Sequence, residues 1–188
     1  NINIKKTNVV LGDKNIVLWG EEYIREKIGE LIFEVSPLSF YQVNSSQVQN
    51  LYDKAKEYAG ITENDTVFDL YCGVGTIGLY MADKAKKLIG VEIVKDARDN
   101  AERNARNNGI DNAEFFAGDC GKVVRNLVNK GEKADIVIVD PPRKGCSEEV
   151  IELLAEINPK KIVYISCNSA TLARDVASLK EKGYKMDK

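Results

Sequence analysis

From residue 66 onward, short apolar runs alternate with segments whose apolar residues recur every three or four positions. The apolar runs predict five strands, at residues 66–71, 87–92, 113–117, 135–139 and 161–166. The segments between them predict helices at residues 75–86, 95–108, 122–129 and 148–157, and a last helix at residues 170–182. Strands that alternate with helices are typical of βαβ units, so we expect an α/β fold with a mostly parallel sheet and helices on both faces.

Two segments outside this repeat indicate how the chain is divided. Residues 1–19 have the pattern of short strands or turn-linked hairpins, and Tyr184 begins what resembles a further strand at the other end. A complete sheet of this class needs more strands than the five predicted. We therefore expect a strand-rich segment at residues 1–35, the remnant of a central linker domain, and a main domain at residues 36–188 that lacks its C-terminal strands.

Capping residues mark two of the predicted helices. A helix is expected at residues 45–59, after an irregular segment, with Ser45 or Ser46 as its N-cap, because serine oxygens accept hydrogen bonds from the free N–H groups of a first turn. Gly109 occupies the C-cap position of the helix that precedes it.

Length and composition fit one α/β domain with a sizeable core. The chain has 188 residues, of which 44% are hydrophobic and 30% charged. It contains no apolar run near the ~20 residues that a membrane helix needs, and no basic-then-apolar leader. We therefore expect a soluble cytoplasmic protein with no membrane partner. The net charge of -2 counts against a nucleic-acid binder, because such proteins usually carry a basic excess on one face.

Cysteine and histidine usage narrows the chemistry. The four cysteines, Cys72, Cys120, Cys146 and Cys167, lie far apart without a Cys-x-x-Cys pair, so we expect free thiols and neither a disulfide nor a metal site. Histidine is absent, which excludes Ser-His-Asp and Cys-His catalysis and any imidazole ligand. A general base must then be a carboxylate, a lysine, a tyrosine or water.

A glycine-rich turn follows the first predicted strand. Residues 68–78 are Phe-Asp-Leu-Tyr-Cys-Gly-Val-Gly-Thr-Ile-Gly, so an apolar strand leads through Gly73 and Gly75 directly into a helix. Glycines let the backbone pass close to a ligand at a helix N-terminus. Glu92 ends the second strand, where an acidic residue in a Rossmann-type sheet accepts hydrogen bonds from ribose hydroxyls. Gly73, Gly75 and Gly78 also have the spacing of the Gly-x-Gly-x-x-Gly motif of dinucleotide-binding proteins, so the turn alone does not exclude a nicotinamide dinucleotide.

Two further motifs follow the fourth and fifth predicted strands. Asp-Pro-Pro-Arg-Lys-Gly occupies residues 140–145, and Ser-Cys-Asn-Ser-Ala-Thr-Leu-Ala-Arg-Asp occupies residues 166–175. Ligands in open α/β sheets bind beyond the carboxyl ends of the strands, so both motifs lie at the ligand-binding edge. Asp-Pro-Pro alone is typical of enzymes that methylate an amino group of a base. Arg143, in the place of an aromatic residue, argues against amino methylation.

Together the motifs resemble those of a known family. Asp-Leu-Tyr-Cys-Gly-x-Gly is similar to the first motif of class I methyltransferases, whereas Asp-Pro-Pro-Arg-x-Gly and Ser-Cys-Asn-x-x-Thr-Leu-Ala-Arg-Asp resemble the RNA uracil-5-methyltransferases. Phe-Tyr-Gln-Val-Asn at residues 40–44 is similar to that family's Phe-x-Gln-Val-Asn segment. The resemblance implies a Rossmann-like enzyme that transfers a methyl group from S-adenosylmethionine to carbon five of a uridine. It implies RNA as the partner, ribosomal RNA ahead of transfer RNA, and no protein partner.

The resemblance also implies roles for individual residues. Cys167, the cysteine of Ser-Cys-Asn, is the expected nucleophile. The expected cofactor contacts are Gln42, Tyr71, Gly73, Gly75, Thr76, Glu92, Asp119 and Asp140. The expected substrate contacts are Asp140, Arg143 and Asn168. Asp119 follows the third strand, where related methyltransferases hydrogen-bond the adenine amino group, although Gly-Asp is also an ordinary turn.

Chemistry explains why a cysteine is needed. Carbon five of uracil is too weakly nucleophilic to take a methyl group directly, so a thiolate first adds at carbon six and creates an enolate. Free cysteines are often merely small buried residues. Asn168 and Ser169, however, place Cys167 on a polar loop that leads into a helix, where exposure and a helix N-terminus favour a thiolate.

The sequence departs from the family pattern in one segment. The family's proton-abstracting glutamate lies in a His-Val-Glu segment beyond the last helix, and this sequence has none. We therefore expect the chain by itself to bind S-adenosylmethionine but to turn over poorly or not at all. Two alternatives stay open. One is a methyltransferase that makes 5-methylcytosine or methylates exocyclic amines, and the other is a non-catalytic fragment that binds cofactor or RNA.

Overall fold

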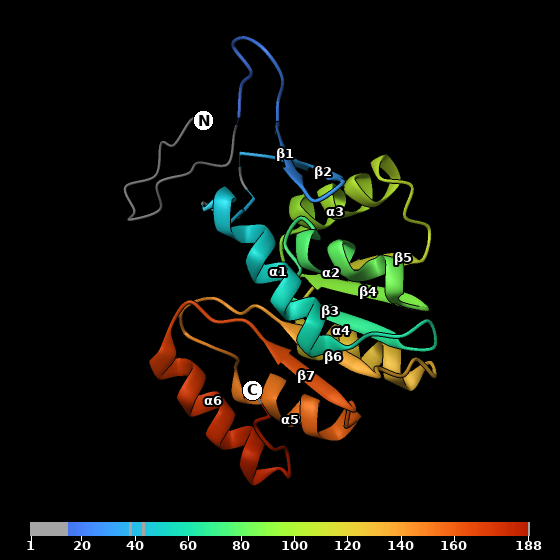
Figure 1. Ribbon diagram of the computed structural model, residues 1–188, viewed down its shortest axis with the longest axis vertical. Helices are drawn as coiled ribbons and strands as arrows, with labels where there is room; N and C mark the ends of the chain where they lie inside the picture. Colours follow the sequence, from blue (N-terminus) through green and yellow to red (C-terminus); the bar gives the residue numbers. More distant parts are fainter. Residues whose placement is uncertain (1–14, 38, 43, 188) are drawn as a thin grey trace.

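The described residues fold around a five-stranded parallel sheet (Figure 1). The computed structural model describes residues 15–37, 39–42 and 44–187. The strands lie in the order β5 (Ala113–Ala117), β4 (Lys87–Glu92), β3 (Thr66–Leu70), β6 (Ile136–Val139) and β7 (Lys161–Tyr164). All neighbouring strands are parallel. The predicted α/β fold with a mostly parallel sheet is confirmed.

The strand order creates a switch point between β3 and β6. The chain winds outward from β3 through β4 to β5, and then returns to the other side of β3 with β6 and β7. Leu70 therefore lies opposite Val91 on one side and opposite Val139 on the other. At a switch point the connections leave in opposite directions and open a crevice beyond the carboxyl ends of the strands. The segments that follow β3 and β6 meet at this crevice.

Helices cover both faces of the sheet (Figure 1). Those on one face are α1 (Ser45–Ala59), α2 (Thr76–Met81) and α3 (Lys95–Asn107). Those on the other face are α4 (Cys120–Asn129), α5 (Glu148–Ile157) and α6 (Ser169–Glu181). Val67 of β3 packs with the first group and its neighbour Phe68 with the second. Alternate residues of one strand thus enter two separate apolar cores, as expected for a sheet that is buried on both faces.

Two helices near the start of the chain differ from the prediction at their ends. Asn44, rather than Ser45 or Ser46, is the N-cap of α1, and the Ser46 hydroxyl donates instead to the Asn44 side-chain oxygen at 2.9 Å. The helix expected at residues 75–86 is shorter and forms α2 followed by a 3₁₀ turn, η1 (Ala82–Lys84). Ending the helix there brings the chain into β4 after a short connection.

Local capping explains two other boundaries. α4 begins at Cys120, earlier than predicted, because the Asp119 carboxylate accepts a hydrogen bond from the Lys122 N–H at 3.2 Å and caps the helix. Asn108 is the C-cap of α3, and Gly109 follows it with a φ of +66°. Gly109 therefore stands one position beyond its predicted place, in the left-handed conformation that favours glycine after a helix.

An antiparallel hairpin of β1 (Ile24–Ile28) and β2 (Leu31–Val35) packs beside α3 (Figure 1). Ile28 and Phe33 of this hairpin are buried in the same apolar core as α1, α2 and α3. The hairpin thus shares the core of the main sheet. The assignment of its residues to a linker domain stays a prediction.

The two ends of the chain differ from the expected strands. Residues 1–14 of the segment predicted to form short strands lie outside the described residues, and residues 15–19 form no strand. Tyr184 does not begin a strand, and its hydroxyl donates to the Leu154 carbonyl at 3.1 Å. None of the helices in the described ranges has the length and apolar character that crossing a bilayer requires.

Asparagines on α3 hold the hairpin in place. The Asn108 side chain accepts from the Ile32 N–H at 2.9 Å and donates to the Ile32 carbonyl at 2.8 Å. One helical turn earlier, Asn104 accepts from the Glu34 N–H at 2.8 Å and donates to the Glu34 carbonyl at 3.1 Å. These amides pair with β2 as a neighbouring strand would. Asn104 also donates to the Val74 carbonyl at 3.0 Å, so it connects the hairpin to the glycine-rich turn.

Candidate functional site

The glycine-rich turn follows β3 and leads into α2. Gly73 and Gly75 have φ angles of +56° and +83°, which glycine adopts without strain. A Cβ atom at Gly75 would lie 3.0 Å from the Ala101 Cβ atom of α3, whereas a Cβ atom at Gly73 would meet nothing within 4 Å. Packing against α3 therefore requires Gly75, and Gly73 leaves one side of the turn open for a ligand.

Glu92 ends β4 and lies beside this turn. Its carboxylate accepts hydrogen bonds from the Gly73 N–H at 3.0 Å and from the Val94 N–H at 2.8 Å. A carboxylate has about four lone-pair sites, so acceptor capacity remains after these two bonds. Glu92 thus fixes the turn and still offers acceptors to the ribose hydroxyls expected from the sequence.

Asp69 of β3 is a buried carboxylate to which the sequence assigned no role. Its Oδ2 atom accepts from the Gly78 N–H at 2.9 Å, and its Oδ1 atom has no partner among the described residues. A Cβ atom at Gly78 would lie 2.7 Å from Oδ2, so the glycine permits this close approach. Burial, with the nearby carboxylates of Asp140 and Glu92, raises the pKa of Asp69 to about 8. In the sequence, the sign that could have pointed to this buried group is a single acidic residue inside an apolar strand.

The raised pKa of Asp69 predicts a pH-dependent stability. The folded state holds this proton more tightly than the unfolded state, so the contribution is fully present below about pH 4 and is lost as the pH rises through about 8. Asp69→Asn has a similar shape and cannot ionise. We expect this substitution to raise the melting temperature more at about pH 9 than at about pH 5, as measured by circular dichroism.

Asp135→Asn is the matched control for this prediction. Hydrogen bonds from Lys160 and from the Thr66 N–H lower the pKa of Asp135, so its contribution is present near neutral pH and is lost as the pH falls. Asp135→Asn should therefore lower the melting temperature at about pH 9, which is the opposite sign. An Asp69→Asn effect that is equal at both pH values would contradict the assignment of a raised pKa to Asp69.

Gln42 and Asp140 meet although 98 positions separate them in the chain. The Gln42 amide donates to Asp140 Oδ2 at 3.1 Å. Asp140 follows β6 at the switch point, where burial raises its pKa to about 6 and the Gln42 hydrogen bond opposes that rise. This bond holds the irregular segment before α1 against the end of β6. Val43, which follows Gln42 in the predicted motif, lies outside the described residues.

Three predicted cofactor contacts have side chains that are engaged elsewhere. The buried Thr76 hydroxyl shares a hydrogen bond of 2.9 Å with the Tyr52 hydroxyl. Tyr71, with a φ of +65°, packs against the core that contains α4 and α5, and burial raises the pKa of its hydroxyl. Asp119 is exposed and caps α4. The cofactor contacts expected of Thr76, Tyr71 and Asp119 stay predictions.

A cavity of about 580 Å³ is lined by Gln42, by the β1–β2 hairpin and by other described residues between β2 and α1. Its lining includes Glu21, Glu22 and Glu26 but none of the residues of the glycine-rich turn. The strand ends, rather than this cavity, bring the predicted site residues together.

Cys167 differs from the other three cysteines in its exposure. It is exposed in the bend between β7 and α6, whereas Cys72, Cys120 and Cys146 are buried. Burial raises the pKa of Cys120 to about 12, that of Cys146 to about 11 and that of Cys72 well above its ordinary value. These three therefore stay thiols at neutral pH. Cys167 is the thiol that faces solvent at the ligand-binding edge.

Hydrogen bonds join the loops that follow β6 and β7. The Arg143 carbonyl accepts from the Asn168 amide and from the Thr171 hydroxyl, each at 3.2 Å. The Asn168 side-chain oxygen accepts from the Ala170 N–H at 3.0 Å and so caps α6. The structure thus brings the predicted substrate residues Arg143 and Asn168 together, next to Cys167.

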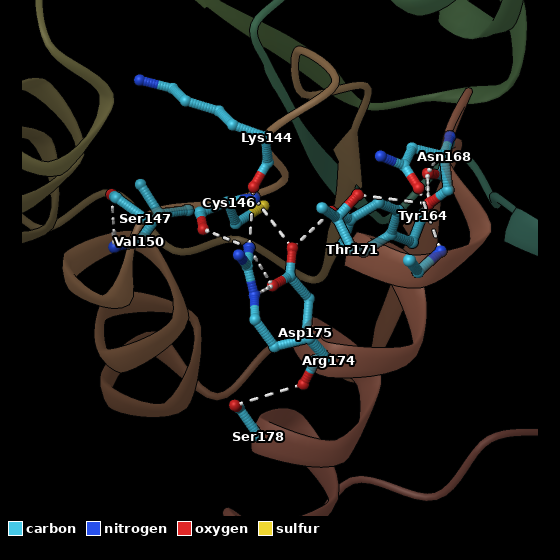
Figure 2. Close-up of polar contacts among 12 residues, drawn as sticks. Lys144, Cys146, Ser147, Val150, Tyr164, Asn168, Thr171, Arg174, Asp175 and Ser178 are labelled. Carbon is cyan, nitrogen blue, oxygen red and sulfur yellow. Dashed lines mark hydrogen bonds and ion pairs between the residues drawn. The ribbon is translucent and has the colours of Figure 1, made fainter.

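Beneath these loops lies Asp175, a carboxylate to which the sequence assigned no role (Figure 2). It is 2% exposed, and its Oδ2 atom accepts from the Tyr164 hydroxyl at 2.6 Å and from the Cys146 N–H at 2.8 Å. Its Oδ1 atom accepts from the Arg174 guanidinium at 2.7 and 2.8 Å. Arg174 also donates to the Lys144 carbonyl at 2.8 Å. The sequence signal was an adjacent Arg-Asp pair, which does not reveal that the aspartate is buried.

The polar groups around the glycine-rich turn favour a cationic nucleoside as ligand. Glu92 and Asp140 are carboxylates, which repel a phosphate and attract hydroxyl, ammonium or sulfonium groups. Asp69, whose raised pKa keeps it protonated at neutral pH, adds a buried oxygen without a partner among the described residues, which can form a hydrogen bond with a polar ligand. S-adenosylmethionine carries all three of these groups and fits the site. Within the described ranges, no cluster of three or more Cys, Asp or Glu residues is arranged to hold a metal ion.

Comparison with known sequences agrees with this chemistry. A family model for tRNA (uracil-5-)-methyltransferase matches residues 4–188. An RNA methyltransferase of Clostridium tetani, described as uncharacterized, is 52% identical over 185 residues, which are 98% of this chain and 40% of the relative. The corresponding protein of Halalkalibacterium halodurans is 51% identical over 184 residues, with the same coverage. The chain thus spans about 40% of the length of these curated relatives.

Solved structures share the fold. The crystal structure of Pyrococcus abyssi tRNA (uracil-54, C5)-methyltransferase in complex with S-adenosyl-L-homocysteine is 36% identical, with a TM-score of 0.82, over 99% of this chain and 44% of that one. An S-adenosylmethionine-dependent methyltransferase of Agrobacterium tumefaciens has a TM-score of 0.66 at 18% identity, over 90% of this chain and 60% of its own, which is a likeness of fold alone. The predicted Rossmann-like methyltransferase fold is confirmed.

Proposed function

The chain belongs to the tRNA (uracil-5-)-methyltransferase family, and from this premise we propose that it transfers a methyl group from S-adenosylmethionine to carbon five of a uridine in RNA, through a covalent bond between Cys167 and the base. The observation that carries the proposal is the exposed Cys167 thiol beside the Arg143 loop, at the sheet edge where Gln42 and Asp140 meet.

Cys167 begins the proposed reaction. Its thiolate adds to carbon six of uracil, which forms the S–C6 bond and moves the electron pair of the double bond toward carbon five and oxygen four. Carbon five then takes the methyl group that S-adenosylmethionine supplies when bound, and the electron pair of the broken S–CH3 bond stays on the sulfur of the departing S-adenosylhomocysteine. A base then removes the proton from carbon five. The electron pair of that C–H bond restores the C5–C6 double bond as the S–C6 bond breaks, and Cys167 is released.

The residues around the glycine-rich turn bind the cofactor. Glu92 accepts hydrogen bonds from the ribose hydroxyls, and the Asp140 carboxylate attracts the cationic end of the molecule. Gln42 orients Asp140 through its hydrogen bond of 3.1 Å. Asn168 caps α6 and so fixes the bend that carries Cys167.

The charges near Cys167 suit an RNA substrate. Arg143 and Lys144 are exposed on the turn after β6, and neither side chain forms an ion pair within the described part of the chain. Two cations at this position suit the phosphates that flank a target nucleotide. The uracil must leave the base stack to reach the Cys167 thiol. Ribosomal RNA in the cytoplasm is the proposed substrate. Transfer RNA, named for the Pyrococcus abyssi enzyme, is the alternative.

Trapping of the covalent intermediate tests this function. In RNA that contains 5-fluorouridine, carbon five has no proton for a base to remove, so the bond to Cys167 persists after methylation. We expect mass spectrometry of the full-length protein, incubated with S-adenosylmethionine and this RNA, to find the nucleotide on the Cys167 peptide. Separate incubations with ribosomal and transfer RNA identify the substrate. Methylation of an exocyclic amine without an adduct, or cofactor binding with neither methylation nor adduct, would contradict the proposal.

A further inference from the structure

The loops after β6 and β7, which carry the proposed reaction, are both fastened to α6 (Figure 2). We infer that Thr171 and Asp175 of α6 are positioning residues, which hold the Asp140–Cys146 loop and the Cys167 loop as one unit. These hydrogen bonds are present in the structure whatever reaction the protein catalyses. Their effect on catalysis rests on the proposed function.

Thr171 joins the two loops at their outer ends. Its hydroxyl lies 3.2 Å from the Arg143 carbonyl and 3.1 Å from the Asn168 carbonyl, so a single O–H donor is shared between one acceptor from each loop. The Asn168 carbonyl also accepts from the Ser166 hydroxyl at 3.0 Å. The residues on both sides of Cys167 are thereby tied to a network that includes the Arg143 backbone.

Asp175 joins the same loops at their inner ends. Its buried carboxylate accepts from the Cys146 N–H at the end of one loop and from the Tyr164 hydroxyl at the end of β7, just before the other. The Arg174 guanidinium binds the same carboxylate and donates to the Lys144 carbonyl. Charge-assisted hydrogen bonds of this kind are stronger than neutral ones, so this end of the unit is the more firmly held.

Gly145 shows how closely the loop approaches α6. It has a φ of +79°, and a Cβ atom there would lie 2.5 Å from both the Arg174 guanidinium and the Asp175 carboxylate, and 3.2 Å from the Thr171 Cβ atom. Contact with both positioning residues therefore requires a glycine at this place in the loop.

This arrangement matters because the reacting groups come from different loops. Asp140 and Arg143 precede Gly145 on one loop, and Cys167 precedes α6 on the other. Addition of a thiolate to carbon six needs the sulfur and the ring at near-attack distance, and small displacements far from the chemistry reduce such rates strongly. Thr171 meets the Arg143 backbone and Asp175 meets Cys146 and Tyr164, and neither hydrogen-bonds to the side chain of Asp140, Arg143 or Cys167 within the described residues, so both act through the position of the loops.

Thr171→Val is the most direct test, because valine keeps the shape of the side chain and removes its only donor. In the full-length protein we expect kcat and the rate of adduct formation with 5-fluorouridine RNA to fall about tenfold, since one hydrogen bond between the loops is lost. The KM for S-adenosylmethionine and the melting temperature should stay at their wild-type values. Thr171→Ser keeps the hydroxyl and should restore the rate.

Ser178→Ala is the matched control on the same helix. The Ser178 hydroxyl donates to the Arg174 carbonyl at 3.3 Å within α6 and reaches neither loop. Its removal should leave kcat and the rate of adduct formation unchanged.

Hydrogen exchange gives a readout that does not depend on activity. Asp175→Asn should speed exchange of the Cys146 amide at least about tenfold, and Thr171→Val should speed exchange across residues 140–146, while the amides of β3 keep their protection. Thr171→Val stays decisive if Asp175→Asn does not fold. The inference would be wrong if Thr171→Val showed both the hydrogen exchange and the reaction rate of the wild-type protein. It would also be wrong if Thr171→Val lost cofactor binding and stability to the same extent as it lost rate. A wild-type protein that forms no adduct would refute the proposed function, and exchange would still decide whether α6 holds the loops.

Discussion

Cys167→Ala is expected to abolish methyl transfer, with a loss of at least about 10³-fold in kcat. Without the S–C6 bond, carbon five keeps the low nucleophilicity of an ordinary pyrimidine. The side chain is exposed, so its truncation should change the melting temperature little. The dissociation constant for S-adenosylmethionine should also stay unchanged, because the proposed cofactor contacts lie around the glycine-rich turn. Methylated nucleosides measured by mass spectrometry and titration calorimetry with the cofactor check both expectations.

Two further substitutions sharpen this result. Cys167→Ser should be as inactive as the alanine variant, since a serine hydroxyl is not ionised at neutral pH and adds poorly to carbon six. Cys120→Ala is the matched control and should keep methyl transfer, because the Cys120 thiol is buried and burial holds its pKa near 12. A Cys167→Ala protein that kept more than about a tenth of wild-type activity would exclude the covalent route and favour amino methylation.

Glu92→Gln is expected to weaken S-adenosylmethionine binding by roughly 10- to 100-fold. The carboxylate accepts from the Gly73 N–H and the Val94 N–H with different oxygens. Glutamine replaces one of these oxygens with an NH₂ group, which faces a backbone donor and cannot accept from a ribose hydroxyl. The substitution therefore removes an anchor of the glycine-rich turn and a cofactor contact together. Titration calorimetry with the cofactor measures the change.

Glu114→Gln is the control for this prediction. Glu114 lies on the neighbouring strand β5, where its carboxylate pairs with Lys87 at 3.2 Å in a partly exposed position. A surface ion pair of this kind contributes little, so cofactor affinity should not change. If Glu92→Gln bound S-adenosylmethionine as tightly as the wild-type protein, Glu92 would only support the turn.

The pattern of apolar positions was sufficient to predict the sheet. Strands that are covered by helices on both faces are nearly continuous apolar runs, and the bounds predicted for β4 and β5 agree with the structure. The placement of the motifs followed from the same pattern. Carboxyl ends of parallel strands share one edge, so the turn after β3 and the loops after β6 and β7 had to lie close together.

Side-chain directions within the motifs were not predictable in this way. Thr76 was expected to contact the cofactor, yet its hydroxyl bonds to Tyr52 because α1 packs directly over α2. Tyr71 was expected at the same site, but its ring packs in the core on the opposite face of the sheet. Arg174 and Asp175 are adjacent, and only the packing of α6 against the loop after β6 decides that the carboxylate is buried.

The sequence by itself determined the order of the elements and the methyltransferase family, and it singled out Cys167 as the expected nucleophile, because periodicity and short motifs depend on neighbours in the chain. The tertiary structure alone decided which carboxylates are buried and which side chains join distant segments. The Gln42–Asp140 bond spans 98 positions, and the Asp175–Cys146 bond spans 29. Such pairs form only where the switch point and the crossing helices bring two segments together. Local patterns show which apolar segments are buried, whereas the burial and the hydrogen-bond partners of single polar side chains depend on the path of the whole chain.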